Sequence, residues 1–258
     1  MNYLIAVLAG ALQGLTEFLP ISSTGHLIIF ENLFNISQDK FGLTFDASLH
    51  LGTLLAVAIF FYKDYITLLK TRNTMVLKLA LGTIPAVIAG LLFENYIETY
   101  ARSLQVVGIS LIIFSIVFVL AEKFSSQKKS WNKTTFLDSL VIGIFQSLAL
   151  IPGVSRSGAT ISAGLFVGLK REEAAKFAFM LSGPIIAGAG LMKFFKATSD
   201  FGVNSSEFAF FMAGMTSAAI FGYLTIKYFL KYLATNTLYP FVYYRVILGL
   251  ILLIFARA

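Results

Sequence analysis

The sequence predicts an all-α integral membrane protein, built as an inverted repeat of two halves with about six transmembrane helices and two re-entrant helical hairpins. Three observations lead to this fold class. The 258 residues are 57% hydrophobic and 13% charged, with a mean hydropathy of +0.82, whereas charged residues make up about a quarter of a soluble domain. Long apolar stretches recur along the chain, and two proline-broken segments resemble each other.

Six apolar stretches are long enough to cross a bilayer as helices. A helix rises 1.5 Å per residue, so about 20 apolar residues span the ~30 Å hydrocarbon core. The stretches cover 45–62, 76–93, 104–121, 177–195, 208–226 and 240–256. We expect each of them to be a transmembrane helix.

The two halves of the chain resemble each other at an offset close to 132 residues. Residues 13–25 (QGLTEFLPISSTG) match residues 146–158 (QSLALIPGVSRSG), with Pro20 placed over Pro152. Further matches follow in the same order: 51–56 with 182–187, Gly82 and Gly90 with Gly214 and Gly222, and 107–114 with 248–255. The chain is therefore expected to be one membrane domain, 1–258, with repeats of about 1–122 and 134–258.

Each half contains one segment that a proline interrupts. The first is helical over about 3–19 and again over about 24–35, and the second over about 136–150 and 156–168. Each piece after the proline measures only about 14–20 Å, too short to cross the bilayer. The segment is either a kinked span or a re-entrant hairpin. Both alternatives predict a polar cavity, because broken backbone at membrane depth must be buried in protein or face water.

The loop charges favour the re-entrant alternative and give an orientation. With six crossings, the loops near 63–75, 122–134, 169–176 and 227–236 share one side and carry twelve Lys and Arg, against five on the opposite side. The positive-inside rule places the twelve in the cytoplasm and both termini outside. Three crossings per half is an odd number, so the halves are inverted and their hairpins meet near the middle. Because the net charge of +7 is spread over these loops, nucleic acid is not an expected partner.

The polar residues of the first broken segment gather around its proline. Gln13 and Glu17 are spaced i, i+4 and therefore share a helix face. After Pro20 a new helix begins with a polar run: Ser22, Ser23, Thr24 and His26. A carboxylate, hydroxyl groups and an imidazole this close together can supply an acid, a base and a nucleophile.

The second broken segment carries the cation. Ser155, Arg156, Ser157 and Thr160 follow its Pro-Gly break, at the start of the second short helix. Free N–H groups and the positive dipole end at a helix start favour an anion. The guanidinium fork of an arginine matches phosphate oxygens. Two such helix starts and one arginine predict a phosphate site.

Simpler readings of the same residues exist. The serines can be plain N-caps, Glu17 a structural partner of Arg156, and His26 a hydrogen-bonded interior histidine. Ionisable residues at membrane depth are costly and usually functional, which favours the site. Three others lie near the ends of predicted spans, where an interfacial position is expected: Asp46, His50 and Arg245.

These motifs resemble those of the undecaprenyl-diphosphate phosphatases of the BacA/UppP type. QGLTE at 13–17 is similar to the family's (E/Q)xxxE motif, PISSTGHL at 20–27 follows it, and PGVSRSGAT at 152–160 matches PGxSRSxxT. Position 13 takes the Gln option, which leaves Glu17 as the only acid of the first motif. His50 stands where relatives are expected to have an amide.

The resemblance implies an enzyme of the bacterial inner membrane, multi-pass, with its site toward the outer side. Its substrate would be a polyprenyl diphosphate lipid, undecaprenyl diphosphate, which it converts to undecaprenyl phosphate, the lipid carrier of cell-wall precursors. A role in bacitracin tolerance is also implied. The sequence leaves open a divalent cation as cofactor and a homodimer as the assembly.

The residues expected to perform the reaction fall into two groups. The catalytic group is Glu17, Ser23, His26 and Arg156, with Ser23 as the first choice of nucleophile and His26 as the second. The phosphate-binding group is Gln13, Ser22, Thr24, Ser155, Arg156, Ser157 and Thr160. The alternative function is a transporter or flippase for an anionic or polyprenyl-phosphate substrate, because many transporters are inverted repeats with half-helix starts at the midplane.

Overall fold

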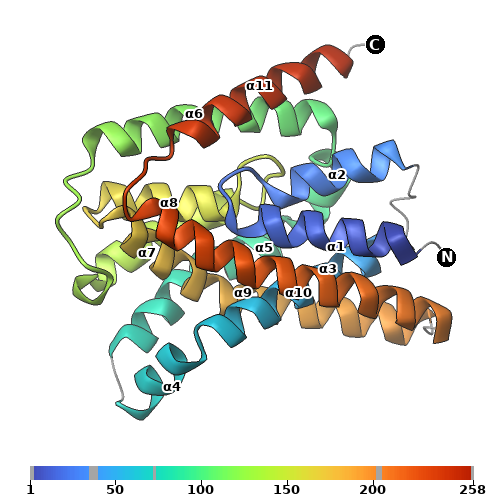
Figure 1. Ribbon diagram of the computed structural model, residues 1–258, viewed down its shortest axis with the longest axis horizontal. Helices are drawn as coiled ribbons and strands as arrows, with labels where there is room; N and C mark the ends of the chain where they lie inside the picture. The colour runs from blue at the N-terminus through green and yellow to red at the C-terminus, as the bar shows by residue number, and fades with distance from the viewer. Residues whose placement is uncertain (1–2, 35–39, 72–73, 202–204, 257–258) are drawn as a thin grey trace.

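The computed structural model describes residues 3–34, 40–71, 74–201 and 205–256, and it is helical almost throughout (Figure 1). Within these ranges, β-type pairing is confined to one isolated bridge between Lys129 and Leu169. The helices, in chain order, are α1 Tyr3–Phe18, α2 Ser23–Leu33, α3 Lys40–Phe60, α4 Tyr62–Lys70, α5 Thr74–Tyr100, α6 Leu104–Phe124, α7 Phe136–Leu148, α8 Arg156–Phe166, α9 Arg171–Phe201, α10 Ser205–Leu233 and α11 Tyr239–Phe255. The predicted all-α class is confirmed.

Most of the predicted spans are present as long apolar helices. In the described part of the chain, α5, α6, α9 and α10 each contain a stretch of 20 to 26 residues that is long and apolar enough to cross a membrane. A fifth span is formed by α3 and α4 together if the 64° bend between them is counted as a break within one crossing. The sixth predicted span corresponds to α11, an apolar helix of 17 residues. The chain is a multi-pass membrane protein.

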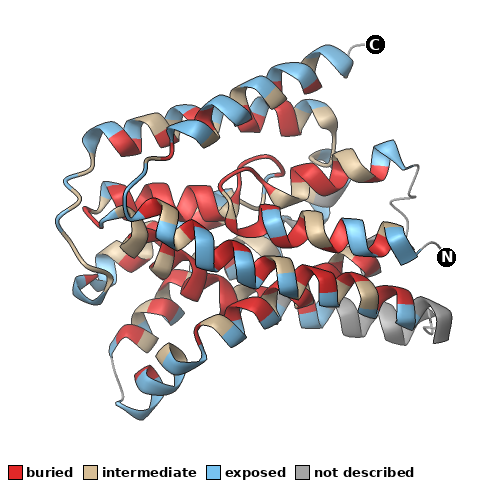
Figure 2. Ribbon diagram, viewed as in Figure 1, coloured by how far each residue is buried: buried red, intermediate tan, exposed pale blue. Residues whose placement is uncertain are grey.

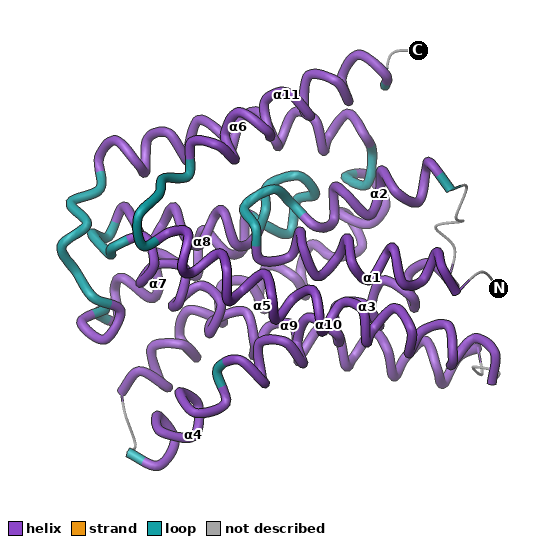
Figure 3. Tube along the Cα trace, viewed as in Figure 1, coloured by secondary structure: helices purple, strands orange, loops and turns teal. Residues whose placement is uncertain are grey.

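The two broken segments form hairpins that approach each other from opposite ends of the molecule. In Figure 1, α2 turns back beside α1, and α8 turns back beside α7. The connecting loops of the two hairpins, teal in Figure 3, lie together near the middle. This arrangement agrees with re-entrant hairpins rather than kinked spans.

The loops lie at the two ends of the bundle as the loop charges predicted. Figure 1 places both termini at one end of the bundle, together with the start of α1 and the end of α2. The connections that follow α4, α6, α8 and α10 lie at the other end, and these are the four basic loops. Which end faces the cytoplasm stays a prediction.

Two close contacts between glycines each join a helix of the first half to a helix of the second half. A Cβ on Gly10 of α1 would lie 2.2 Å from the carbonyl oxygen of Gly214 on α10. A Cβ on Gly143 of α7 would lie 2.4 Å from the carbonyl oxygen of Gly82 on α5. Small residues let membrane helices approach this closely. This pair of contacts favours the predicted duplication, while the inversion of complete halves and their boundaries stay predictions.

Helices α6 and α11 pack along each other and lie together beside the two hairpin loops (Figure 1). They meet at Gly108 and Gly249, where a Cβ on either residue would approach the carbonyl oxygen of the other to within 3.0 Å. Figure 2 shows buried residues around the hairpins and exposed residues on the outer helix faces. Those outer faces are rich in Leu, Ile and Phe, including Leu91 and Leu92, which suits contact with lipid.

Candidate active site

The two short helices begin with the same unusual serine cap. Ser22 precedes α2 with φ 73° and ψ 94°, and Ser155 precedes α8 with φ 74° and ψ 112°. Positive φ is uncommon outside glycine. Each hydroxyl oxygen accepts a hydrogen bond from a backbone N–H three residues on, at 3.3 Å from Gly25 and 3.2 Å from Gly158. The two broken segments are therefore alike in local geometry as well as in sequence.

These caps fit the predicted match of residues 13–25 with residues 146–158. Ser22 corresponds to Ser155 and Gly25 to Gly158, which is an offset of 133. Pro20 and Pro152 are 132 residues apart, so the two prolines do not coincide in this register, because the capping hydroxyl and not the proline defines each helix start. In the same register Ser23 corresponds to Arg156, and each is the first residue of its short helix.

The two turns are in direct contact. Ser22 Oγ also accepts a hydrogen bond from the backbone N–H of Gly153, at 3.1 Å, so one hydroxyl connects the two breaks. In return, Ser157 Oγ donates to the carbonyl oxygen of Leu19 at 2.9 Å. The starts of α2 and α8 are thereby fixed next to each other.

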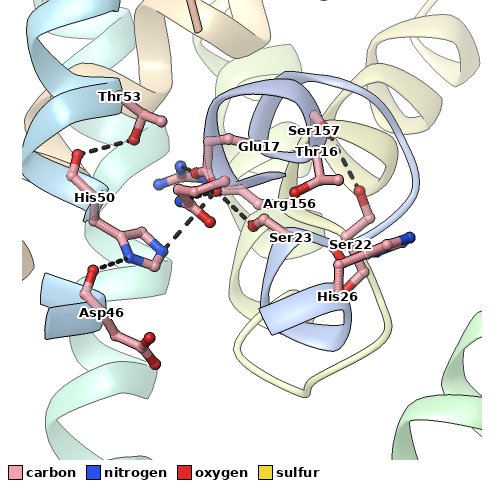
Figure 4. Close-up of polar contacts among 12 residues, drawn as sticks. Thr16, Glu17, Ser22, Ser23, His26, Asp46, His50, Thr53, Arg156 and Ser157 are labelled. Atoms are coloured by element: carbon pink, nitrogen blue, oxygen red, sulfur yellow. Dashed lines mark hydrogen bonds and ion pairs between the residues drawn. The ribbon is translucent and has the colours of Figure 1, made fainter. Parts of the chain in front are cut away.

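Glu17 stands at the centre of this site (Figure 4). Its Oε2 accepts hydrogen bonds from Ser23 Oγ at 2.5 Å and from Gln13 Nε2 at 2.9 Å. Its Oε1 forms an ion pair with Arg156 Nη2. The Glu17 side chain is 4% exposed and that of Arg156 is 21% exposed. The structure therefore brings together the predicted carboxylate, the preferred nucleophile and the arginine, from opposite halves of the chain.

His26 points away from this cluster. Figure 4 shows its imidazole on the other side of the α2 start from Glu17. Nδ1 lies 2.7 Å from the carbonyl oxygen of Ser22, and Nε2 lies 2.6 Å from the hydroxyl oxygen of Tyr244. A carbonyl can only accept, so Nδ1 carries the proton and, in the neutral ring, Nε2 accepts from Tyr244. In this arrangement the base next to Ser23 is Glu17.

Apart from Gln13 of α1, the remaining predicted phosphate ligands lie in the first turns of α2 and α8 or at their caps, where the serine hydroxyl groups and that of Thr160 have hydrogen-bond partners. Ser155 Oγ and Ser157 Oγ are 3.2 Å apart. Thr160 Oγ1 donates to the carbonyl oxygen of Arg156 at 2.7 Å, so it supports the first turn of α8. Thr24 is half-buried in the first turn of α2. Gln13 Oε1 is buried and has no hydrogen-bond partner among the described residues.

Two residues that the sequence placed at the membrane interface lie beside the site. His50 Nε2 is 3.9 Å from Glu17 Oε2, and the imidazole is 29% exposed. Arg245 is fully buried, so its predicted interfacial position was wrong. A charge within the apolar stretch 240–256 was the available signal. Asp46 lies farther out on α3, where its Oδ2 accepts from Arg102 Nη2 at 3.1 Å.

Comparison with known proteins places the chain in a family. The family described as bacitracin resistance protein BacA matches residues 6–251. An undecaprenyl-diphosphatase of Elusimicrobium minutum is 44% identical over 265 residues, covering 99% of both chains. An undecaprenyl-diphosphatase of Rubrobacter xylanophilus is 42% identical over 262 residues, covering 95% of both. Undecaprenyl-diphosphatase 3 of Bacillus cereus is 41% identical over 254 residues, covering 98% of this chain and 97% of its own. The chain belongs to the BacA family.

Proposed function

We propose that this protein hydrolyses undecaprenyl diphosphate to undecaprenyl phosphate and inorganic phosphate. Membership of the BacA family and the relatives named undecaprenyl-diphosphatase support this function. The observation that carries it is the arrangement around Glu17, which holds Ser23 through one oxygen and Arg156 through the other. A nucleophile, a base and a phosphate-binding cation are therefore within reach of one substrate group.

Substrate binding begins with an exchange of partners at Arg156. In the free protein its guanidinium pairs with Glu17. The terminal phosphate of the lipid offers more negative charge and a geometry that accepts two parallel N–H bonds. We propose that the phosphate takes over the guanidinium and the N–H groups at the starts of α2 and α8. Glu17 is thereby released to act on Ser23.

The reaction proceeds by transfer of the terminal phosphoryl group to Ser23. Ser23 Oγ attacks the terminal phosphorus while its proton passes to Glu17, whose Oε2 lies 2.5 Å away. The bond from this phosphorus to the bridging oxygen breaks, and undecaprenyl phosphate leaves with the electron pair. Water then attacks the phosphorus of the phosphoserine, and the bond from this phosphorus to Ser23 Oγ breaks. Ser23 Oγ takes back the proton that Glu17 holds, and the protons of the water leave with inorganic phosphate. Arg156 stabilises the transferred group in both steps.

His26 is the second choice of nucleophile, and the structure favours Ser23 over it. The imidazole is bound by Ser22 and Tyr244 on the side away from Glu17. An attack by His26 requires it to leave both partners, whereas Ser23 already contacts its base.

A divalent cation fits the site as an addition brought with the substrate. Gln13 Oε1 is a buried oxygen without a partner among the described residues, and Glu17 lies one helical turn away. No group of three or more His, Cys, Asp or Glu side chains in the described ranges suits a metal ion. Of the described residues, Gln13 and Glu17 are the ones proposed to bind it, and phosphate oxygens and water would supply the other oxygens that a hard cation needs. Such a cation would neutralise charge on the diphosphate.

We further propose that the protein resides in the bacterial inner membrane with its site open toward the outer side. The four loops with twelve Lys and Arg follow α4, α6, α8 and α10, and the C-terminal ends of these helices lie at one end of the bundle, which supports this orientation. The prenyl tail stays in the bilayer, against the apolar outer faces of the helices. A contribution to bacitracin tolerance accords with the description of the family.

Phosphate release in detergent tests the proposed function against the transporter alternative. Purified protein is mixed with a polyprenyl diphosphate, and free phosphate is followed over time. In detergent there is no barrier to cross, so released phosphate can arise only by cleavage of the anhydride. We expect release by the wild type, and its absence would leave transport as the function.

A further inference from the structure

Arg245 of α11 is a fully buried cation next to the site, and the proposed reaction gives it no role. Its exposed fraction is 0%. Its guanidinium donates to three backbone carbonyl oxygens, those of Pro20 at 3.2 Å, Gly153 at 3.0 Å and Val154 at 3.2 Å. Nε donates to Ser115 Oγ of α6 at 3.3 Å. Each of the three guanidinium nitrogens of Arg245 therefore has a hydrogen-bond acceptor.

The carbonyl groups that Arg245 holds belong to both breaks. Pro20 lies two residues before the Ser22 cap, whereas Gly153 and Val154 immediately precede the Ser155 cap. Nη1 binds the first turn and Nη2 binds the second. One planar group thus fixes the spacing between the start of α2, which presents Ser23, and the start of α8, which presents Arg156.

A second contact connects Arg245 to the second helix start. Its guanidinium carbon lies 4.6 Å from the centre of the Phe118 ring. The same ring fills the space beside Gly158, where a Cβ would lie 2.1 Å from the Phe118 Cζ atom. Arg245, Phe118 and the first turn of α8 therefore form one stack, which a displaced guanidinium would loosen.

The charge of Arg245 has no carboxylate partner among the described residues, whose ion pairs all involve other side chains. Arg171 and Glu122 show the usual arrangement elsewhere in this chain, with Arg171 Nη2 2.6 Å from Glu122 Oε2. A buried charge without a counterion is expensive at membrane depth. A neutral side chain would serve packing at lower cost, which indicates that the cation is needed at this position.

We propose that Arg245 is a positioning residue for the phosphatase reaction: it sets the two phosphate-binding turns against each other, so that Ser23 and Arg156 converge on one phosphorus. It touches neither the nucleophile nor the substrate. Its positive charge lies behind both helix starts and adds to their attraction for a diphosphate. The proposal rests on the phosphatase function and names a requirement of the same site.

The variants Arg245→Met, Arg245→Lys and Arg171→Gln in the full-length protein in detergent test this role. Arg245→Met removes the charge and every hydrogen bond, while Arg245→Lys keeps the charge but not the planar fork. Arg171→Gln is the control, because it breaks the ion pair of a partly exposed arginine with the buried Glu122, at the end of the bundle away from the site. The measurements are kcat and KM for phosphate release, inhibition by inorganic pyrophosphate, and the melting temperature.

We expect Arg245→Met to lower kcat by about a hundredfold, the loss that a misplaced reacting group causes. Pyrophosphate inhibition should weaken in the same variant, because the two helix starts no longer share a ligand. Compared with Arg245→Met, Arg245→Lys should bind pyrophosphate more tightly, because the charge is kept. Its kcat should improve less, because the planar group that holds both turns is lost. Arg171→Gln should lower the melting temperature while kcat stays near that of the wild type.

Two results would overturn the proposal. The first is an Arg245→Met protein that melts like Arg171→Gln and keeps the wild-type kcat, since the residue would then be structural only. The second result is an unchanged kcat in Ser115→Ala, which is the variant to measure if Arg245→Met does not fold. Ser115→Ala removes the acceptor of Arg245 Nε, together with the hydrogen bond of Ser115 to Leu111 within α6, and should lower kcat about fivefold. An unchanged kcat in this variant contradicts the role. An inactive wild type would instead refute the phosphatase function itself.

Discussion

Ser23 and Arg156 are held by the two oxygens of one carboxylate, that of Glu17, although they lie in opposite halves of the chain. Each is the first residue of a short helix that follows a serine cap with positive φ. The contact places a hydroxyl and a guanidinium on either side of a single base. The first predictions concern these two residues.

Ser23→Ala removes the proposed nucleophile while leaving the Ser22 cap in place. We expect phosphate release to fall by at least about a thousandfold, because Ser23 supplies the only hydroxyl group that is hydrogen-bonded to Glu17 in the described part of the chain. Ser147→Ala, on the exposed face of α7, is the control and should behave as wild type. Substantial turnover in Ser23→Ala would contradict attack by this serine.

Trapping the phosphorylated intermediate separates Ser23 from His26. Rapid denaturation after mixing with substrate labelled in the terminal phosphate should leave the label on Ser23. A phosphoserine survives acid and is lost in strong base, whereas a phosphohistidine behaves in the opposite way. Label that is lost in acid, and absent from His26→Asn, would make His26 the nucleophile.

Arg156→Lys keeps a positive charge but loses the guanidinium fork. We expect kcat/KM to fall by roughly a hundredfold, which is the scale of losing one directed donor to the transferred group. Arg102→Lys, farther out near Asp46, is the control for a changed arginine at a different ion pair. Activity close to wild type in Arg156→Lys would mean that Arg156 only supports the fold through Glu17.

Chelation tests the divalent cation. If a cation accompanies the substrate, EDTA should abolish most phosphate release and added Mg²⁺ or Ca²⁺ should restore it. Gln13→Leu removes the oxygen proposed to bind it, so the cation concentration for half-maximal activity should rise by about tenfold. Full activity in EDTA would show that Arg156 and the helix starts suffice.

Gly143→Ala tests the close approach of α7 and α5. Its new Cβ would lie 2.4 Å from the Gly82 carbonyl oxygen, so the helices must separate. We expect the melting temperature to fall by roughly 5 °C, from the cost of overpacking. At Gly90 an added Cβ meets nothing within 4 Å, so Gly90→Ala should not destabilise the protein. Equal effects of the two would argue against the contact.

The sequence predicted the parts of this fold that have local signals. The expected short helices of about 24–35 and 156–168 are Ser23–Leu33 and Arg156–Phe166 in the structure, because a proline and a capping serine determine where such helices begin. The ion pair of Glu17 with Arg156 was among the simpler readings of the sequence, and the structure contains it. Separate charges at membrane depth are costly, which favours such a pair.

Other parts of the site could not be predicted from local signals. Pro20 does not lie over Pro152 in the register of the two caps, since Pro20 precedes its cap by two residues and Pro152 precedes its cap by three. Arg245 was misplaced because its partners are backbone carbonyl groups of distant turns, and a carbonyl has no signature in sequence. The contact of Tyr244 with His26 was missed for a similar reason, as it depends on how α11 packs over the hairpins.

The shared position of Ser23 and Arg156 also explains why two unequal halves are useful. An assembly of two identical halves would carry the same residue at both helix starts, and so would offer two hydroxyl groups or two guanidinium groups to a ligand. With the halves joined in one chain, each start can change on its own. In the proposed mechanism one start supplies the nucleophile and the other supplies the phosphate-binding guanidinium, and two identical halves could not supply both.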